Sequence, residues 1–133
     1  MSQNDLRVLE GSWRLLESES RAYGRMVGGQ LRIAYCFAGN PRMIGQMYDW
    51  RQTGDTLVAR FQWVSGDLSG FVYLKPVTAN RMEGGWWSAP SDAPHPLFPQ
   101  GLPPSKTIMS SVWQRLPHDT ALPEWAEQLL SPA

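Results

Sequence analysis

The sequence predicts an all-β fold, a small antiparallel up-and-down (meander) β-barrel with a short C-terminal helix. Two glycine-first pairs, Gly54-Asp55 and Gly66-Asp67, each interrupt a β-rich run in the way typical of a two-residue hairpin turn. About seven β-rich runs follow one another, mostly through short connections. An open sheet of this kind would leave two edges and one apolar face in water, so closure into a barrel is favoured.

Length and charge narrow the class of protein. The 133 residues fit one domain, 1–133, which buries roughly two-thirds of its unfolded surface at this size. The 12 basic and 12 acidic residues cancel, so we expect no nucleic-acid partner and no membrane partner. The chain has no signal-like start and no run of about 18 apolar residues, which indicates a cytoplasmic protein. Cys36 is the one cysteine, so an intrachain disulfide is excluded.

The chain begins with a lead-in and a first strand. Residues 1–10 contain too few apolar positions to define a helical face and form the N-terminal lead-in. Residues 11–20 form the first strand, and side-chain alternation places Trp13, Leu15 and Glu17 on one of its faces.

A connection and a second strand follow. Residues 21–30 contain three glycines, which favours a mobile connection. Residues 31–37 form a β-rich run that ends at a strong turn signal, 38–41.

The two glycine-first pairs set the expected register of the central strands. Counting outward from the first turn pairs Tyr48 with Phe61 and, on the other face, Asp49 with Arg60. Counting from the second turn pairs Phe61 with Val72. Period-two alternation then gathers one apolar face: Tyr48, Trp50, Leu57, Ala59, Phe61, Trp63, Val72 and Leu74.

The next strand, 81–87, has two possible registers. A three-residue loop before it places Trp86 opposite Gly70, and we prefer this register; a two-residue loop places Trp87 there. The adjacent glycines at 84–85 predict a curved or bulged strand with space for neighbouring rings or a ligand.

The last third of the chain alternates irregular and regular segments. Residues 88–105 contain six prolines and form a strap or a lid, and these two alternatives are about equally favoured. Residues 106–116 form the final strand. Residues 123–130 begin with Pro123, a residue common in the first turn of a helix, and form one short amphipathic helix.

The first and last strands of the predicted barrel carry residues that resemble those of a known family. Gly11-Ser12-Trp13 on the first strand and Trp113-Gln114-Arg115 on the last resemble the calycin pattern of lipocalins, fatty-acid-binding proteins and avidins. The resemblance implies that Trp13 packs at the floor of the barrel and that Arg115 stacks across it. Cation–π attraction gives this pairing its physical basis.

The candidate ligand-binding residues are an aromatic set with one polar member. They are Gln46, Tyr48, Trp50, Phe61, Trp63 and Trp86. A largely apolar cavity with few hydrogen-bonding groups is the usual make-up of a small-molecule site. The leading hypothesis is therefore a non-enzymatic protein that binds a small hydrophobic or aromatic molecule in the barrel interior. The alternative for the same rings is an interior that they fill completely.

A second hypothesis concerns the outer face of the sheet, which is too apolar to face water throughout. Its apolar residues are Met43, Met47, Phe71, Tyr73, Trp87, Met109 and Trp113. The C-terminal helix, the proline-rich segment or a second copy of the chain must cover part of this face. Because aromatic residues and Met are enriched at interface cores, we predict a homodimer, or a protein–protein interaction module with a packed core.

A third hypothesis is an enzyme that uses the barrel mouth and His95. Asp92 stands three residues before His95 and is able to orient its imidazole. However, no second His or Cys has a matching spacing, and the sequence contains no Gly-x-Ser-x-Gly elbow. We therefore expect no catalytic residue, no metal and no cofactor.

Overall fold

The computed structural model describes residues 3–37, 40, 42–64, 68–94, 108–118 and 120–131. Within these residues, a 3-10 helix, a meander of eight strands and a short helix follow one another. They are η1 (Gln3–Leu9), β1 (Gly11–Leu15), β2 (Ser20–Val27), β3 (Gln30–Cys36), β4 (Ile44–Thr53), β5 (Thr56–Trp63), β6 (Ser69–Thr78), β7 (Arg81–Ser88), β8 (Met109–Arg115) and α1 (Glu124–Leu130).

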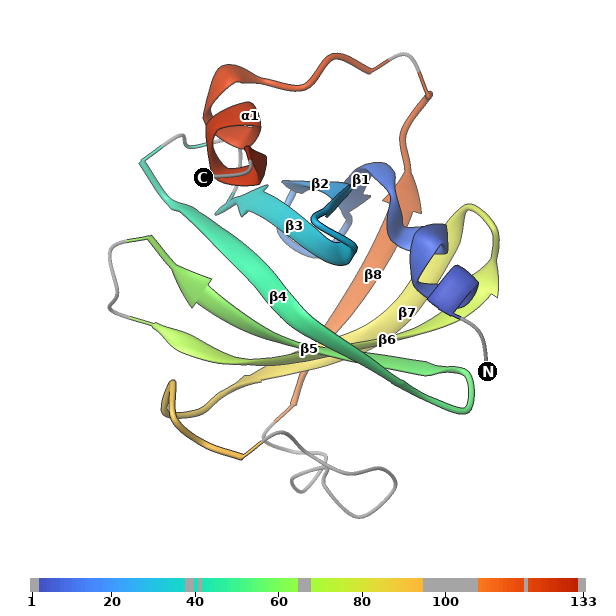
Figure 1. Cartoon of the computed structure of the whole chain (residues 1–133), viewed down its shortest axis with the longest axis vertical. Helices are drawn as coiled ribbons and strands as arrows, with labels where there is room; N and C mark the ends of the chain where they lie inside the picture. Colours follow the sequence, from blue (N-terminus) through green and yellow to red (C-terminus); the bar gives the residue numbers. More distant parts are fainter. Residues whose placement is uncertain are drawn as a thin grey trace.

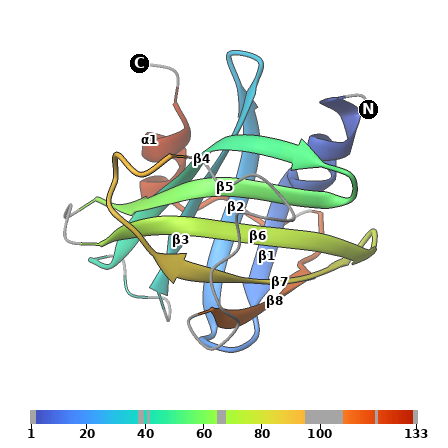
Figure 2. The same cartoon turned by 90° about the horizontal axis from the view of Figure 1, so that it is seen from below.

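The strands form a closed antiparallel barrel, which confirms the predicted fold class (Figure 1). Each strand pairs with its neighbour in the chain, and β8 pairs with β1 through Trp13 and Arg115. Figure 2 shows β4, β5, β6 and β7 side by side on one side of the barrel. No helix in the described part of the chain is long and apolar enough to cross a membrane.

The expectation of a mobile connection at 21–30 is wrong, because most of this segment is strand β2. Gly28 and Gly29 have φ values of 59° and 82° and join β2 to β3 by a tight turn, with Val27 paired to Gln30. Two positive φ values in succession are the geometry of a type I′ hairpin, for which glycine is well suited. The glycines therefore mark a turn, and β2 brings the described strands to eight.

The first central turn lies where it is predicted, but the register beyond it is shifted by one residue. Thr53 pairs with Thr56 across the turn, and a bulge then follows between Tyr48 and Arg51. Asp49 in this bulge has a φ of 57°. Because the bulge adds one residue to β4, the side chains before it point to the face of the sheet opposite to the predicted one.

Because of the bulge, two residues that the sequence places in the pocket lie on the opposite face of the sheet. Tyr48 pairs with Arg60, and Met47 pairs with Phe61. Tyr48 and Gln46 therefore lie on the outer face, while Met47 points inward and is 5% exposed. The predicted pairing of Tyr48 with Phe61 is wrong, because these side chains lie on opposite sides of the sheet.

The β5–β6 and β6–β7 registers differ from the predicted ones by an even number of residues. Phe61 pairs with Gly70 and Ala59 with Val72, because the connection after Trp63 is longer than two residues. Gly70 pairs with Ser88, so neither register considered for 81–87 is correct. Even shifts preserve the faces, so the side chains of β5, β6 and β7 point to the predicted sides. The Gly66-Asp67 pair itself lies outside the described residues.

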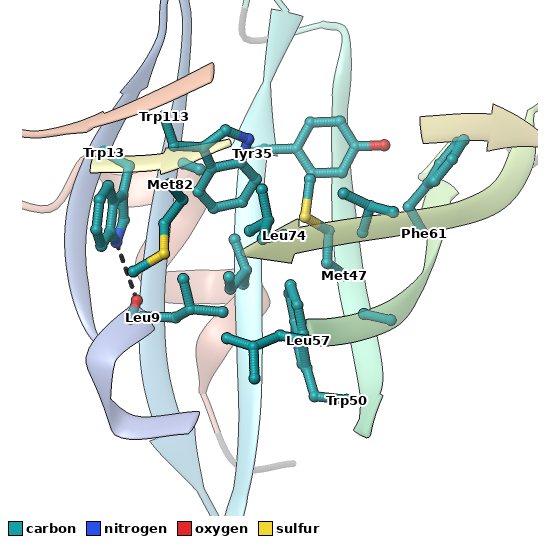
Figure 3. Close-up of a cluster of buried hydrophobic side chains, with 14 of the residues drawn as sticks. Leu9, Trp13, Tyr35, Met47, Trp50, Leu57, Phe61, Leu74, Met82 and Trp113 are labelled. Atoms are coloured by element: carbon teal, nitrogen blue, oxygen red, sulfur yellow. Dashed lines mark hydrogen bonds between the residues drawn. The ribbon is translucent and has the colours of Figure 1, made fainter. Parts of the chain in front are cut away.

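One end of the barrel is closed by η1 and by a contact between Trp13 and Arg115. The Arg115 guanidinium lies over the Trp13 ring, 4.2 Å from its centroid, and donates to the carbonyl oxygens of Glu10 (2.7 Å), Val8 and Ala79. The Trp13 indole N–H donates to the carbonyl oxygen of Leu9 at 3.1 Å (Figure 3). We refer to this end as the closed end.

The outer face is less apolar than the sequence indicates. Trp113 and Met47, two of the residues expected there, are interior and are 0% and 5% exposed. Phe71 and Trp87 do lie outside and pack against each other, with ring centroids 5.6 Å apart.

The C-terminal helix covers a different part of the outer face. Ala126 and Leu130 of α1 are fully buried against β2 and β3. Trp125 makes an edge contact with Tyr23, with ring centroids 5.7 Å apart. Among the described strands, the helix thus covers the outer face of β2 and β3 and none of those that carry the predicted apolar outer face (Figure 1).

Candidate functional site

The barrel encloses a cavity of about 500 Å³ at the end opposite η1. Its walls are mainly aromatic and aliphatic side chains from seven strands and the segments that flank them, and we call it the interior cavity. Its main lining residues are Leu15, Tyr35, Phe37, Met47, Phe61, Trp63, Val72, Trp86 and Trp113. This volume lies within the range of about 300 to 1,000 Å³ that is usual for small-molecule sites.

The aromatic rings hold one another in fixed orientations. Tyr35 and Trp63 meet edge to face with ring centroids 5.2 Å apart, and Phe61 and Trp86 do the same at 5.8 Å. Edge-to-face contacts of this kind are the preferred arrangement of aromatic pairs. Figure 3 shows Tyr35, Met47 and Phe61 on one side of the core, with Leu9 on the opposite side. The rings therefore form a preformed apolar wall rather than a fully packed plug.

One wall of the interior cavity is polar. The Glu17 carboxylate accepts from the Ser111 hydroxyl at 2.7 Å and from the Val112 backbone N–H at 2.9 Å. The Ser111 oxygen in turn accepts from the Trp113 indole N–H at 3.0 Å. Ser111 is 2% exposed, so this chain of donors runs from inside the barrel outward to Glu17.

Three of the six predicted pocket residues lie around the interior cavity, namely Phe61, Trp63 and Trp86. Trp50 is also interior and 9% exposed, but it does not line this cavity. Gln46 and Tyr48 lie on the outer face for the reason given above, so neither serves as the orienting polar group predicted for Gln46.

Several lining residues were missed by the sequence prediction. Alternation along the sequence places Met47 on the outer face, because the bulge at Asp49 leaves no clear signal. Tyr35 is not predicted because the sequence does not fix the register of its strand against the central meander. Glu17 does carry a signal in the sequence, since alternation along the predicted strand 11–20 places it on the same face as Trp13 and Leu15.

A larger groove of about 1090 Å³ lies beside β3 and β4 and includes the two displaced residues. Its polar groups are engaged with one another. Arg32 donates to Gln46, Arg60 contacts the Asp49 carboxylate at 3.2 Å, and the Tyr48 hydroxyl donates to Gln62 at 3.4 Å. These mutual contacts make the groove the weaker candidate for a ligand site.

The buried indole of Trp63 has no hydrogen-bond partner for its N–H among the described residues. A buried donor without a partner costs roughly 1 to 3 kcal/mol. Trp63 also lines the interior cavity, so this donor belongs to a residue of its wall.

Replacing Tyr35 by phenylalanine is expected to reduce the loss of stability at alkaline pH. Burial raises the pKa of the Tyr35 phenol above its ordinary value. The unfolded chain releases the phenol proton at about pH 10, whereas the folded chain retains it. The contribution of Tyr35 to the free energy of unfolding therefore falls as the pH rises above this value. Urea unfolding at about pH 8 and about pH 11 measures the effect.

The matched control for Tyr35→Phe is Tyr48→Phe, which alters a tyrosine on the outer face. We expect Tyr48→Phe to keep the alkaline decline of the wild type. Equal declines in the wild type and in Tyr35→Phe would contradict the prediction.

The residues considered for catalysis or metal binding lie only partly within the described ranges. His95 lies outside the described residues. Cys36 is on β3 and is 4% exposed. Within the described ranges, no three or more His, Cys, Asp or Glu side chains gather in a way that could hold a metal ion.

The fold and the interior cavity define a small closed antiparallel β-barrel with an aromatic interior. No protein-family model and no curated protein matches the chain. Among solved structures, the chain is similar to a redesigned beta barrel, with a TM-score of 0.55 and 13% identity over 83% of this chain and 93% of that chain. It is also similar to EF1p2_mFAP2b bound to DFHBI, with a TM-score of 0.55 and 12% identity over 84% of this chain and 97% of that chain. At these identities the likeness concerns the fold alone.

Proposed function

We propose that this chain is a non-enzymatic binding protein that holds a small hydrophobic or aromatic molecule in the interior cavity. The observation that carries the proposal is a cavity of about 500 Å³ lined largely by aromatic rings, with few polar groups. Apolar walls supply affinity by removing ligand surface from water, at about 25 cal/mol per Å². The few polar groups at Glu17, Ser111 and Trp63 orient the bound molecule.

Two further observations support this proposal. The similar barrel EF1p2_mFAP2b has a structure with DFHBI bound, so a barrel of this shape accommodates a small molecule. The contact between Trp13 and Arg115 is the one that the calycin resemblance implies for the barrel floor. We therefore propose a calycin-like barrel whose closed end is structural and whose opposite end binds the ligand.

The apolar outer face supports a second function less well. Of its expected residues, Met47 and Trp113 point into the barrel, and Phe71 is 3% exposed. An interaction module acting through this face therefore has fewer exposed apolar side chains with which to contact a partner. Homodimerisation through the remaining residues stays a prediction, as does a cytoplasmic location.

Titration with the neutral fluorogenic dye N-phenyl-1-naphthylamine tests the proposed function. We expect the dye emission to rise as it binds the wild-type protein. Replacing Trp86 by leucine should weaken binding about tenfold, which corresponds to about 1.4 kcal/mol, because part of the apolar wall is lost. The dye titration of both proteins gives the ratio directly.

The neighbouring Trp87 provides a matched control. Trp87 lies on the outer face, packs on Phe71 and does not line the interior cavity. Trp87→Leu removes the same side chain from the next position in β7, and we expect its affinity for the dye to remain within about twofold of the wild type. If both variants weaken binding equally, or if the wild-type protein binds no dye, the proposed function is wrong.

A further inference from the structure

The interior cavity has one charged side chain among its described lining residues, and that side chain is acidic. Glu17 lies at the mouth, beside the serines at 18 and 20, and no Lys or Arg lines the cavity within the described residues. The ion pairs found in the described part of the chain do not include Glu17. Among the described residues, no cation at the cavity therefore balances its negative charge.

The Glu17 carboxylate is held in place but retains free acceptor capacity. Ser111 and the Val112 backbone donate to its two oxygens, at 2.7 and 2.9 Å. A carboxylate offers about four lone-pair sites, so about two remain for a ligand. The Trp113 indole donates to Ser111, and a donor chain of this kind strengthens the hydrogen bond that ends on the carboxylate.

The aromatic part of the cavity lining also favours positive charge. The faces of aromatic rings carry the negative part of their quadrupole and attract organic cations. Trp63 and Trp86 both line the cavity, and tryptophan is the strongest of the aromatic residues in this respect. Trp86 and Ser111 lie on paired strands, with Trp86 opposite Met109 and Gly84 opposite Ser111, so the Trp86 ring is a neighbour of the Ser111 side chain that donates to Glu17.

We propose that the ligand of the interior cavity is a hydrophobic organic cation, an aromatic or alkyl ammonium compound. Its apolar body lies against the rings and its ammonium group lies at the mouth beside Glu17. This inference rests on the proposed function and adds the charge of the ligand to it. Placing the charge at the mouth leaves it partly hydrated, which limits the desolvation cost that a deeply buried ion would carry.

A pair of ligands with the same shape tests the charge preference. Trimethyl(1-naphthylmethyl)ammonium carries a positive charge, and 1-neopentylnaphthalene replaces the charged nitrogen by carbon. Each compound competes with N-phenyl-1-naphthylamine for the wild-type protein and for Glu17→Gln. We expect Glu17→Gln to weaken the ammonium compound about tenfold and to change the neutral compound by less than about twofold. Glutamine still accepts from Val112 and bonds to Ser111, so the fold is kept, and the urea midpoint verifies this.

The control variant is Glu19→Gln, which removes the same charge two residues away. Glu19 lies outside the cavity and pairs with Arg14. We expect it to leave the affinity for the ammonium compound within about twofold of the wild type. Equal effects of Glu17→Gln and Glu19→Gln would overturn the inference. They would show that the affinity for the ammonium compound depends on the overall negative charge in this region and not on Glu17.

The outcomes separate the inference from the proposed function. Displacement by the neutral compound without any dependence of the ammonium compound on Glu17 overturns the charge preference and leaves the binding function standing. Absence of dye binding by the wild-type protein overturns both. Loss of ammonium affinity in Glu17→Gln alone, with the neutral compound unchanged, supports both.

Discussion

Replacing Arg115 by methionine is expected to lower the free energy of unfolding by about 3 kcal/mol, because several interactions at the closed end are lost together. The guanidinium lies 4.2 Å from the centre of the Trp13 ring and donates to three backbone carbonyl groups. Two of these carbonyls belong to Val8 and Glu10, so Arg115 joins the N-terminal segment to the barrel. Methionine keeps much of the apolar stem but provides no donor.

Urea unfolding measures this loss, and Arg81→Met is the matched control. Arg81 pairs with Glu83 at 2.9 Å on the surface, and such exposed pairs contribute about 0 to 1 kcal/mol. We expect Arg81→Met to change stability by less than about 1 kcal/mol. Similar losses in the two variants would contradict a special role for Arg115 at the closed end.

The closed end shows what the sequence predicts well. The calycin resemblance implies the contact of Trp13 with Arg115, and in the closed barrel these two residues are paired on β1 and β8. The order of the strands in a closed meander is enough to predict that β1 and β8 meet. The inward positions of Phe61 and Trp86 are predictable for a related reason, since face alternation survives any shift of register by an even number of residues.

The bulge at Asp49 shows what the sequence does not predict. Asparagine and aspartate tolerate positive φ better than other side chains, but most aspartates do not form bulges. The observed φ of 57° moves Gln46 and Tyr48 to the outer face and brings Met47 inward. One residue with an unusual backbone conformation therefore exchanged members of the predicted pocket, while the overall fold remained as predicted.

The polar wall of the cavity depends on contacts between distant segments. Glu17 follows β1, and Ser111 lies on β8, 94 positions away in the chain. Each residue alone is an ordinary polar side chain. Their contact depends on the closure of the barrel and on the register of β1 with β8, so the sequence predicts the apolar part of the site better than its polar part.

Replacing Gly84 by alanine is expected to destabilise the barrel by about 3 kcal/mol or more, because the added methyl group overlaps backbone atoms. A Cβ at this position would lie 1.9 Å from the Tyr73 carbonyl oxygen and 3.0 Å from the Leu74 Cα. Side chains yield by changing rotamer, but here β6 and β7 themselves would have to separate. The space left by this glycine is thus occupied by the neighbouring strand rather than by a ring or a ligand.

The control for Gly84→Ala is Gly28→Ala, measured by urea unfolding under the same conditions. A Cβ at Gly28 would meet nothing within 4 Å, but the φ of 59° disfavours any side chain. This conformational strain costs about 1 kcal/mol, so the control separates backbone strain from overlap. We expect Gly84→Ala to lose at least twice as much stability as Gly28→Ala or to fail to fold. Equal losses would contradict the close approach of β6 and β7 at Gly84.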